Sequence, residues 1–169
     1  MNITEFLQQT AGKWFSQRTA HQVESSQTQT GKSTLYVEFL ASDDPKVKTL
    51  CDRHGLETAL AGTRMSWEAT IDPSAQSYKG ERLLVWVGDV QNPQMGKFFS
   101  SVEGSSPGSF VLDEDEILTL RVESQGQVSE DRLWFASPNF RLRTSLTQVS
   151  GETVFASLCT EIRLGGNPA

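Results

Sequence analysis

The sequence contains few of the side chains that most metal and nucleophile sites require. It has only two histidines and two cysteines in 169 residues, and His21 and His54 lie in different segments. Cys51 and Cys159 form neither a disulfide framework nor a metal-binding spacing. We therefore expect neither a metal centre nor a histidine-based catalytic triad.

Basic residues and long apolar runs are also scarce. The 15 lysines and arginines are outnumbered by 21 aspartates and glutamates, so the formal net charge is −6. Because nucleic acids and membrane surfaces attract basic faces, we expect neither as a partner. The longest apolar run, Leu83-Leu84-Val85-Trp86-Val87, is too short to span a bilayer. The segment Met1-Asn2-Ile3-Thr4-Glu5 lacks the features of a signal peptide, which favours a reducing cytoplasm.

What the sequence does contain is a series of short segments with two-residue alternation, separated by Gly, Pro, Ser and Asn clusters. The length favours one domain over residues 1–169. Closure into an antiparallel barrel would remove exposed edges, so we predict a mainly all-β, ten-stranded antiparallel barrel. The predicted strands lie near Gly12–Glu24, Ser33–Leu40, Thr63–Ile71, Glu81–Asp89, Lys97–Val102, Ser109–Leu112, Glu116–Glu123, Gln127–Ala136, Phe140–Gln148 and Thr153–Leu164.

Two short helices are predicted to cover an opening or a side of this barrel. The first follows a possible cap at Asn2 or Thr4, where apolar residues recur at helical spacing. The second has Asp44 as its cap, Pro45 in its first position and Gly55 as its stop.

Two catalytic-looking motifs are better explained as turns. Thr30-Gly31-Lys32-Ser33 resembles the end of a phosphate-binding loop, but Ser26 stands where that loop needs a glycine, so we expect a hairpin turn. Gly104-Ser105-Ser106-Pro107-Gly108 has the spacing of a nucleophile elbow but lies between two predicted strands, without the helix that an elbow requires.

Alternation predicts which side chains line the barrel, because one parity on each strand faces inward. Met65 and Trp67 share an apolar stripe that faces inward, either as plain core or as a ligand contact. Arg141 and Arg143 share one face of a strand. If that face is outside, the arginines are simply solvated; if it is inside, they need anionic partners, which a dicarboxylate ligand would supply.

Further candidates lie on neighbouring strands. Trp14 and Arg18 share a face of the first strand, and Glu130 or Asp131 offers a carboxylate shortly before the paired arginines. A cavity that combines arginine, a carboxylate and tryptophan suits an amphipathic aromatic anion better than a fatty acid.

Four segments together resemble a known family, the S-type (CpcS/CpeS-like) phycobiliprotein lyases, over nearly the whole chain. The most specific part is the Pro138-Asn139-Phe140-Arg141-Leu142-Arg143 block with its preceding tryptophan. The segments are Ala11-Gly12-Lys13-Trp14-Phe15-Ser16-Gln17-Arg18-Thr19, Met65-Ser66-Trp67, Leu133-Trp134-Phe135-Ala136-Ser137-Pro138-Asn139-Phe140-Arg141-Leu142-Arg143-Thr144-Ser145 and Cys159-Thr160-Glu161-Ile162-Arg163.

The resemblance implies a lipocalin or fatty-acid-binding-protein-like barrel that binds an open-chain bilin such as phycocyanobilin as substrate, with no permanently bound cofactor. It associates Arg18, Arg141 and Arg143 with the bilin propionates and an acidic residue near Asp131 with the pyrrole nitrogens. It places Met65, Trp67 and Ser145 around the same pocket. The chain departs from some relatives in having Ile71-Asp72-Pro73 where a second aromatic would stand.

The implied reaction is addition of a cysteine thiol of an apo-phycobiliprotein subunit, phycocyanin β or allophycocyanin, to the ethylidene group of bilin ring A. We expect the chain to act by positioning, with Asp131, Arg141 and Arg143 as the catalytic candidates and Asp131 stabilising a protonated tetrapyrrole. A homodimer or a heterodimer with a related lyase chain stays open. The alternative is a non-catalytic carrier of a bilin or another amphipathic ligand.

Neither cysteine is expected to carry the bilin covalently. Cys51 lies on the apolar face of the second helix, where a thiol behaves as a small hydrophobe. Cys159 shares a parity with Glu161 and Arg163, opposite an apolar stripe that includes Leu158, so we expect it to point away from the lumen unless a bulge turns it inward.

Overall fold

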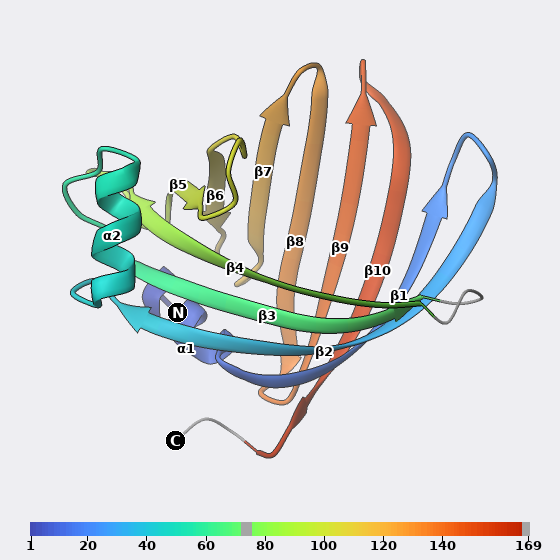
Figure 1. Cartoon of the computed structure of the whole chain (residues 1–169), viewed down its shortest axis with the longest axis horizontal. Coiled ribbons are helices and arrows are strands. Elements are labelled where there is room, and N and C mark those ends of the chain that lie inside the picture. The colour runs from blue at the N-terminus through green and yellow to red at the C-terminus, as the bar shows by residue number, and fades with distance from the viewer. Residues whose placement is uncertain (72–75, 167–169) are drawn as a thin grey trace.

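The computed structural model describes residues 1–71 and 76–166. Ten antiparallel strands close into a barrel in the order β1-β10-β9-β8-β7-β6-β5-β4-β3-β2, with two short helices (Figure 1). The predicted fold class is therefore confirmed. The elements are α1 Ile3–Thr10, β1 Gly12–Gln22, β2 Gln27–Ala41, α2 Pro45–Arg53, β3 Ala61–Ile71, β4 Gln76–Gly88, β5 Met95–Ser100, β6 Gly108–Leu112, β7 Leu118–Ser124, β8 Gln127–Ser137, β9 Phe140–Val149 and β10 Glu152–Leu164.

The strand β2 begins earlier than the sequence predicts, and this changes the role of one motif. Thr30 pairs with Thr19, and Gly31 pairs with Arg18 and with Ile71, so Thr30-Gly31-Lys32-Ser33 lies inside the ladder. The prediction of a hairpin turn there is wrong. The chain reverses between β1 and β2 instead, where Ser26 adopts a left-handed conformation with φ of 52°.

The helix α1 fills one end of the barrel. Its cap is a capping box: the Asn2 side chain accepts a hydrogen bond from the Glu5 amide at 2.9 Å, and the Glu5 carboxylate accepts one from the Asn2 amide at 2.8 Å. Phe6 is fully buried and meets Phe135 edge to face at 5.3 Å. This end is therefore closed by apolar packing and leaves no room for a ligand. The cluster contains Ile3, Phe6, Leu7, Ala61, Leu84, Trp86, Phe98, Phe110, Leu112 and Leu118.

The helix α2 packs on the outside of the barrel. Asp44 accepts a hydrogen bond from the Lys46 amide at 2.8 Å and caps the helix as predicted. Val47 lies so close to Gly62 of β3 that a Cβ there would be 2.6 Å from its methyl group. The helix therefore covers a side of the barrel and not its opening. No helix in the described part of the chain is long and apolar enough to cross a membrane.

The barrel wall is incomplete beside β4. The strand β5 pairs only with β4 residues from Leu84 to Gly88, whereas β3 pairs with β4 residues from Gln76 to Trp86. Within the described ranges, residues 77–82 of β4 thus have a paired strand on one side only. Their inward-facing side chains, Tyr78 and Arg82 among them, are exposed. The barrel therefore opens sideways along this half of β4.

Replacing Phe6 by alanine should lower the free energy of unfolding by about 3–5 kcal/mol, because the substitution leaves a cavity in the closed end. Chemical denaturation measures this loss. The matched variant Val90→Ala, at a fully exposed position, should change the stability by less than about 0.5 kcal/mol. Equal stabilities of the two variants would show that α1 does not close the barrel as described.

Candidate ligand-binding site

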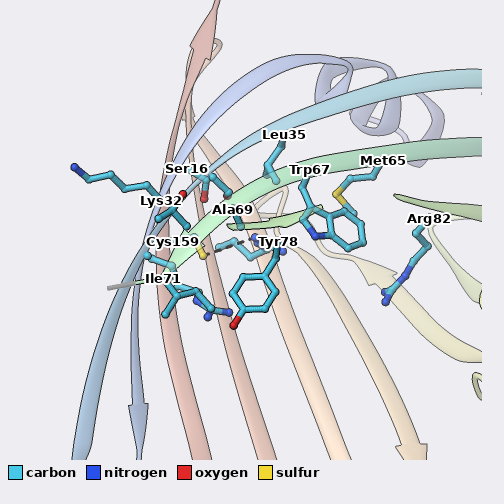
Figure 2. Close-up of a pocket in the computed structure, with 15 residues that line it drawn as sticks. Ser16, Lys32, Leu35, Met65, Trp67, Ala69, Ile71, Tyr78, Arg82 and Cys159 are labelled. Carbon is cyan, nitrogen blue, oxygen red and sulfur yellow. Dashed lines mark hydrogen bonds between the residues drawn. The ribbon is translucent and has the colours of Figure 1, made fainter. Parts of the chain in front are cut away.

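A cavity of about 360 Å³ occupies the open half of the barrel, on the far side of the core from α1 (Figure 2). Strands β1 to β4 supply most of its wall, and β9 and β10 supply the rest. The two-residue period explains this lining, since the side chains from each strand belong mainly to one parity. The lining residues are Ser16, Arg18, Gly31, Lys32, Ser33, Leu35, Met65, Trp67, Ala69, Thr70, Ile71, Tyr78, Arg82, Arg143 and Cys159.

The charge of the cavity is opposite to that of the chain. Three arginine side chains line it, Arg18, Arg82 and Arg143, and no acidic residue is among the described lining, whereas the side chain of Lys32 points away from the cavity (Figure 2). Within the part of the chain that the structure describes, Arg18 and Arg82 form no ion pair. In a protein of net charge −6 this concentration of unpaired positive charge favours an anionic ligand.

Beneath the cavity, Glu161 joins two arginines in a buried network. Its carboxylate is fully buried, 2.5 Å from Arg141 Nε and 3.2 Å from Arg143 Nη2, and it accepts a hydrogen bond from Ser16 at 3.2 Å. We expected a ligand to supply the anionic partner of Arg141 and Arg143, but Glu161 of the chain itself supplies part of it. The sequence analysis missed Glu161 because it placed that parity of β10 outside.

Arg141 belongs to the interior of the protein and not to the cavity wall. Its guanidinium carbon lies 4.1 Å from the centre of the Trp14 ring, and Arg163 covers the same ring at the same distance. Trp14 is fully buried and donates to the Thr10 carbonyl at 2.9 Å. Burial lowers the pKa of Arg141 despite the attraction of Glu161. We therefore assign Arg141 and Trp14 to the support of the site.

Arg143 links the buried network to the cavity. One of its nitrogens binds Glu161, yet a third of its side chain is exposed. Its Nε is buried without a hydrogen-bond partner among the described residues, which leaves a donor for a ligand or a water. Although burial opposes it, the attraction of Glu161 and Asp131 raises the pKa of Arg143.

The predicted carboxylates lie on opposite faces of β8. Asp131 faces inward beside Arg143 and accepts a hydrogen bond from Ser145, its cross-strand partner. Neither Asp131 nor Ser145 is among the residues that line this cavity, although Asp131 lies close to Arg143, which does line it. Glu130 faces outward, 4.0 Å from Arg121 of β7, and is not part of the site.

Met65 and Trp67 of β3 face inward, as the alternation predicts, and line the cavity. The position of the Trp67 indole is explained by Gly80, its paired residue on the neighbouring strand β4. A Cβ on Gly80 would lie 2.3 Å from Trp67 Cζ2, so the ring lies flat over a residue that has no side chain. Tyr78 and Arg82, on either side of Gly80, were missed although they share its parity. Asp72 and Pro73, where the sequence departs from some relatives, lie outside the described residues.

The prediction that Cys159 of β10 points away from the lumen is wrong. Cys159 is 2% exposed, lines the cavity, and lies 3.7 Å from Arg143 Nη2 (Figure 2). The apolar residues of the opposite parity face the solvent instead, with Leu158 43% exposed and Ile162 53% exposed. Cys51 is buried in α2 as predicted, and burial raises the pKa of its thiol.

Comparisons with known proteins agree along the whole chain. A family model described as CpeS-like protein matches residues 2–164. The chain is 42% identical to the chromophore lyase CpcS/CpeS of Thermosynechococcus vestitus over 98% of this chain and 94% of that one. It is 30% identical to the phycocyanobilin lyase subunit CpcS of Picosynechococcus, over 97% and 87%. The solved structure of the S-type phycobiliprotein lyase CPES from Guillardia theta superposes with a TM-score of 0.86 at 30% identity, covering 99% and 95% of the chains.

The buried network predicts a pH dependence of stability. Burial alone would raise the pKa of Glu161, but the attraction of Arg141 and Arg143 outweighs it and holds the pKa below its usual 4.5. A carboxyl whose pKa is lowered by folding stabilises the protein above the pKa it has when unfolded, and this contribution disappears as the pH falls through its folded-state pKa.

Glu161→Gln should therefore lower the free energy of unfolding at neutral pH by about 3–5 kcal/mol, because Arg141 loses the partner of its buried charge. The variant should also lose less stability than the parent on acidification below the usual pKa of 4.5. Urea denaturation across this pH range measures both effects. Glu123→Gln, which removes an exposed carboxylate paired with Arg121, is the control and should follow the parent within about 1 kcal/mol. A parent-like pH profile for Glu161→Gln would contradict the assigned network.

Proposed function

The chain belongs to the CpeS-like family, and from this we propose that it is a chromophore lyase, which binds an open-chain bilin in its barrel and attaches it to a cysteine of an apo-phycobiliprotein subunit. The names of its relatives support the reaction class. The observation that carries the proposal is the cavity itself, where three arginine side chains and Trp67 lie together without a lining carboxylate. A bilin combines two propionates with a planar conjugated chain, which matches these two kinds of group.

Each propionate is assigned to an arginine that reaches the cavity. Arg18 from β1 and Arg143 from β9, which the family resemblance associates with the propionates, both line the cavity and can form charge-assisted hydrogen bonds with a propionate. Arg141 acts indirectly, since it fixes Glu161, which in turn orients Arg143. This assignment replaces the direct contact between Arg141 and a propionate that the family resemblance suggested.

Asp131 is assigned to the pyrrole nitrogens. A carboxylate near them favours the protonated tetrapyrrole, whose ring A is a better electrophile. Ser145 holds the carboxylate of Asp131 on the inner face of the barrel, next to Arg143. Met65 and Trp67 supply the apolar wall for the ring system.

The proposed reaction is an addition. The acceptor thiol forms a carbon–sulfur bond with the ethylidene group of ring A, and its proton passes to the bilin, so no group leaves. The chain contributes by holding the bilin with ring A at the lateral opening along residues 77–82, where an acceptor can approach. Cys159 is 2% exposed and Cys51 is buried in α2, so the reacting sulfur is assigned to the acceptor.

Phycocyanobilin is the bilin we propose, and phycocyanin β or allophycocyanin the acceptor. The name of the Picosynechococcus relative, a phycocyanobilin lyase subunit, supports the first choice. The bilin is a substrate in this proposal and not a resident cofactor. We place the reaction in the cytoplasm, because both cysteines are free thiols and a reducing compartment maintains them. A non-catalytic carrier is the competing function; it would bind bilin but leave no colour on an acceptor after denaturing electrophoresis.

Arg143→Leu should weaken phycocyanobilin binding about 10- to 150-fold, the equivalent of about 1.5–3 kcal/mol for a lost charge-assisted hydrogen bond. Absorbance titration of the purified variant measures the affinity. Arg132→Leu, on the outer face of β8, is the matched control and should bind like the parent. Parent-like affinity in a folded Arg143→Leu protein would overturn the assignment of the propionate site.

Asp131→Asn should keep most of the affinity but shift the absorption of the bound bilin to shorter wavelength and slow transfer to the acceptor, because the variant no longer favours the protonated tetrapyrrole. Spectra of the complex and the rate of covalent colour formation test this. Glu130→Asn, one residue away on the outer face, should leave both unchanged. A parent-like spectrum and rate for Asp131→Asn would exclude this carboxylate from the reaction.

A further inference from the structure

Arg82 of β4 is the cavity arginine to which the two propionates assign no partner. Three arginines line the cavity, whereas a bilin carries two propionates, and these are assigned to Arg18 and Arg143. The side chain of Arg82 is exposed, and it forms no ion pair with any other residue that the structure describes. A third cation thus remains for another participant in the reaction.

The position of Arg82 is the lateral opening of the barrel. The residue belongs to the stretch 77–82 of β4, which has a paired strand on one side only. Its paired residue on β3 is Met65, and both side chains leave the sheet on the cavity side. Figure 2 shows the Arg82 side chain extended and apart from the other labelled side chains. A group that enters the cavity through this opening therefore comes within reach of the Arg82 guanidinium.

The proposed reaction needs a thiolate, and no base lines the described part of the cavity to produce one. The thiolate is the nucleophilic form of cysteine, and a free cysteine, with a pKa of about 8.5, is mostly protonated at neutral pH. No carboxylate or histidine is among the described lining residues. His21 lies beside Thr28 near the β1–β2 hairpin, and His54 binds the Ser100 carbonyl at the end of α2, outside the barrel. A nearby cation is the remaining means of favouring the thiolate there.

We propose that Arg82 holds the acceptor sulfur as a thiolate at the lateral opening while it attacks ring A of the bilin. This inference rests on the proposed function and adds a residue to it. The thiol proton leaves to solvent through the opening, and the sulfur forms a bond with the ethylidene carbon. The electron pair of the double bond moves into the tetrapyrrole, which takes up one proton from solvent. Nothing is oxidised, reduced or released, and the guanidinium stays charged throughout.

The charged groups on the strands beside Arg82 do not compete for this role. Lys79 and Glu81 lie on the outer face of β4, where they pair with Glu68 and Arg64 of β3. The inner face of β3 next to Arg82 carries Met65 and Trp67, which do not titrate. Glu103, in the turn that follows β5, forms no ion pair among the described residues.

The titratable groups elsewhere around the cavity have other partners. The Tyr78 hydroxyl donates to the Gln76 side chain at 2.8 Å. On β8, Asp131 is held by Ser145 and assigned to the pyrrole nitrogens. The inward residues of β7, Leu118, Leu120 and Val122, do not titrate. The remaining groups are Arg18 of β1 and Arg143 of β9, which are assigned to the propionates, and Cys159 of β10, which is 2% exposed.

Transfer of phycocyanobilin to an apo-phycocyanin β subunit, followed between about pH 6 and pH 10, tests the role of Arg82. In Arg82→Gln the acid limb of the pH–rate profile should move up by about one pH unit, and transfer at pH 7 should slow about 3- to 10-fold. Above the pKa of the thiol the variant should match or exceed the parent, because a thiolate of higher pKa is the better nucleophile.

Two further variants are the controls for this assay. Arg82→Lys keeps the positive charge and should restore most of the parent profile. Lys79→Gln removes a positive charge from the outer face of the same stretch of β4 and should follow the parent at every pH. All three variants should bind bilin like the parent in an absorbance titration.

A second assay replaces the acceptor by 2-mercaptoethanol, a small thiol that carries no carboxylate. Its addition to the ethylidene group shortens the conjugated system of the bound bilin, so absorbance follows the reaction. Arg82→Gln should slow this addition at pH 7 and lose the effect at high pH, as in transfer to the subunit. The small thiol therefore separates an effect on the reacting sulfur from an effect on acceptor docking.

Three results would overturn the inference. A loss of bilin affinity in Arg82→Gln equal to that in Arg143→Leu would assign Arg82 to a propionate. Slower transfer with an unchanged pH profile and a normal reaction with 2-mercaptoethanol would make it a docking contact for the acceptor. Parent-like transfer at every pH would exclude it from the reaction. A parent that binds bilin but colours no acceptor would instead contradict the proposed function, and the reaction with 2-mercaptoethanol would still decide the role of Arg82.

Discussion

A carboxylate buried between two arginines connects the packed and the open halves of the barrel. Glu161 has no contact with solvent and binds both Arg141 and Arg143. Removing it would leave Arg141 charged and unpaired in the interior, which costs more than the pair contributes when intact. The network continues to α1, because Arg141 stacks on Trp14 and Arg163 covers the other face while it donates to the Gln9 carbonyl at 2.7 Å. The helix that closes the barrel is thereby joined to the wall of the cavity.

This connection places one arginine in a fixed position at the cavity wall. Arg143 is held from behind by Glu161, yet part of its side chain remains exposed to the cavity. A ligand that binds it does not have to order a free side chain, so less conformational entropy is lost on binding. Arg18 has no ion pair among the described residues and is not held in this way. The two arginines are thus unequal, and the first anchor for an anion is Arg143.

The sequence predicts the strands better than it predicts which way some of them face. Period-two alternation locates all ten strands, and it orients β3 correctly because the apolar parity of that strand faces inward. The same rule fails on β10, where the polar parity of Cys159 and Glu161 faces inward. Resemblance to a family identifies Arg141 and Arg143, but only the fold separates a buried arginine from one that lines the cavity. The register that pairs Arg141 with Glu161 joins residues of two strands, and no local pattern specifies it.

The inner face of β10 is polar and its outer face is apolar, which is the reverse of the usual arrangement in a barrel. Each residue of a strand faces one side only, so a strand that supplies Glu161 and Cys159 to the inside presents the alternate residues, Leu158 and Ile162, to the outside. A charged interior site is normally built by adding polar residues to an apolar inner face, and the outer face then stays polar. On β10 the arrangement is the reverse, because the inner face is polar and the outer face is apolar. The residues of β10 that support the cavity, Cys159 and Glu161, therefore alternate along the strand with apolar residues that face the solvent, so a single strand sets both the polarity of the interior and that of the surface behind it.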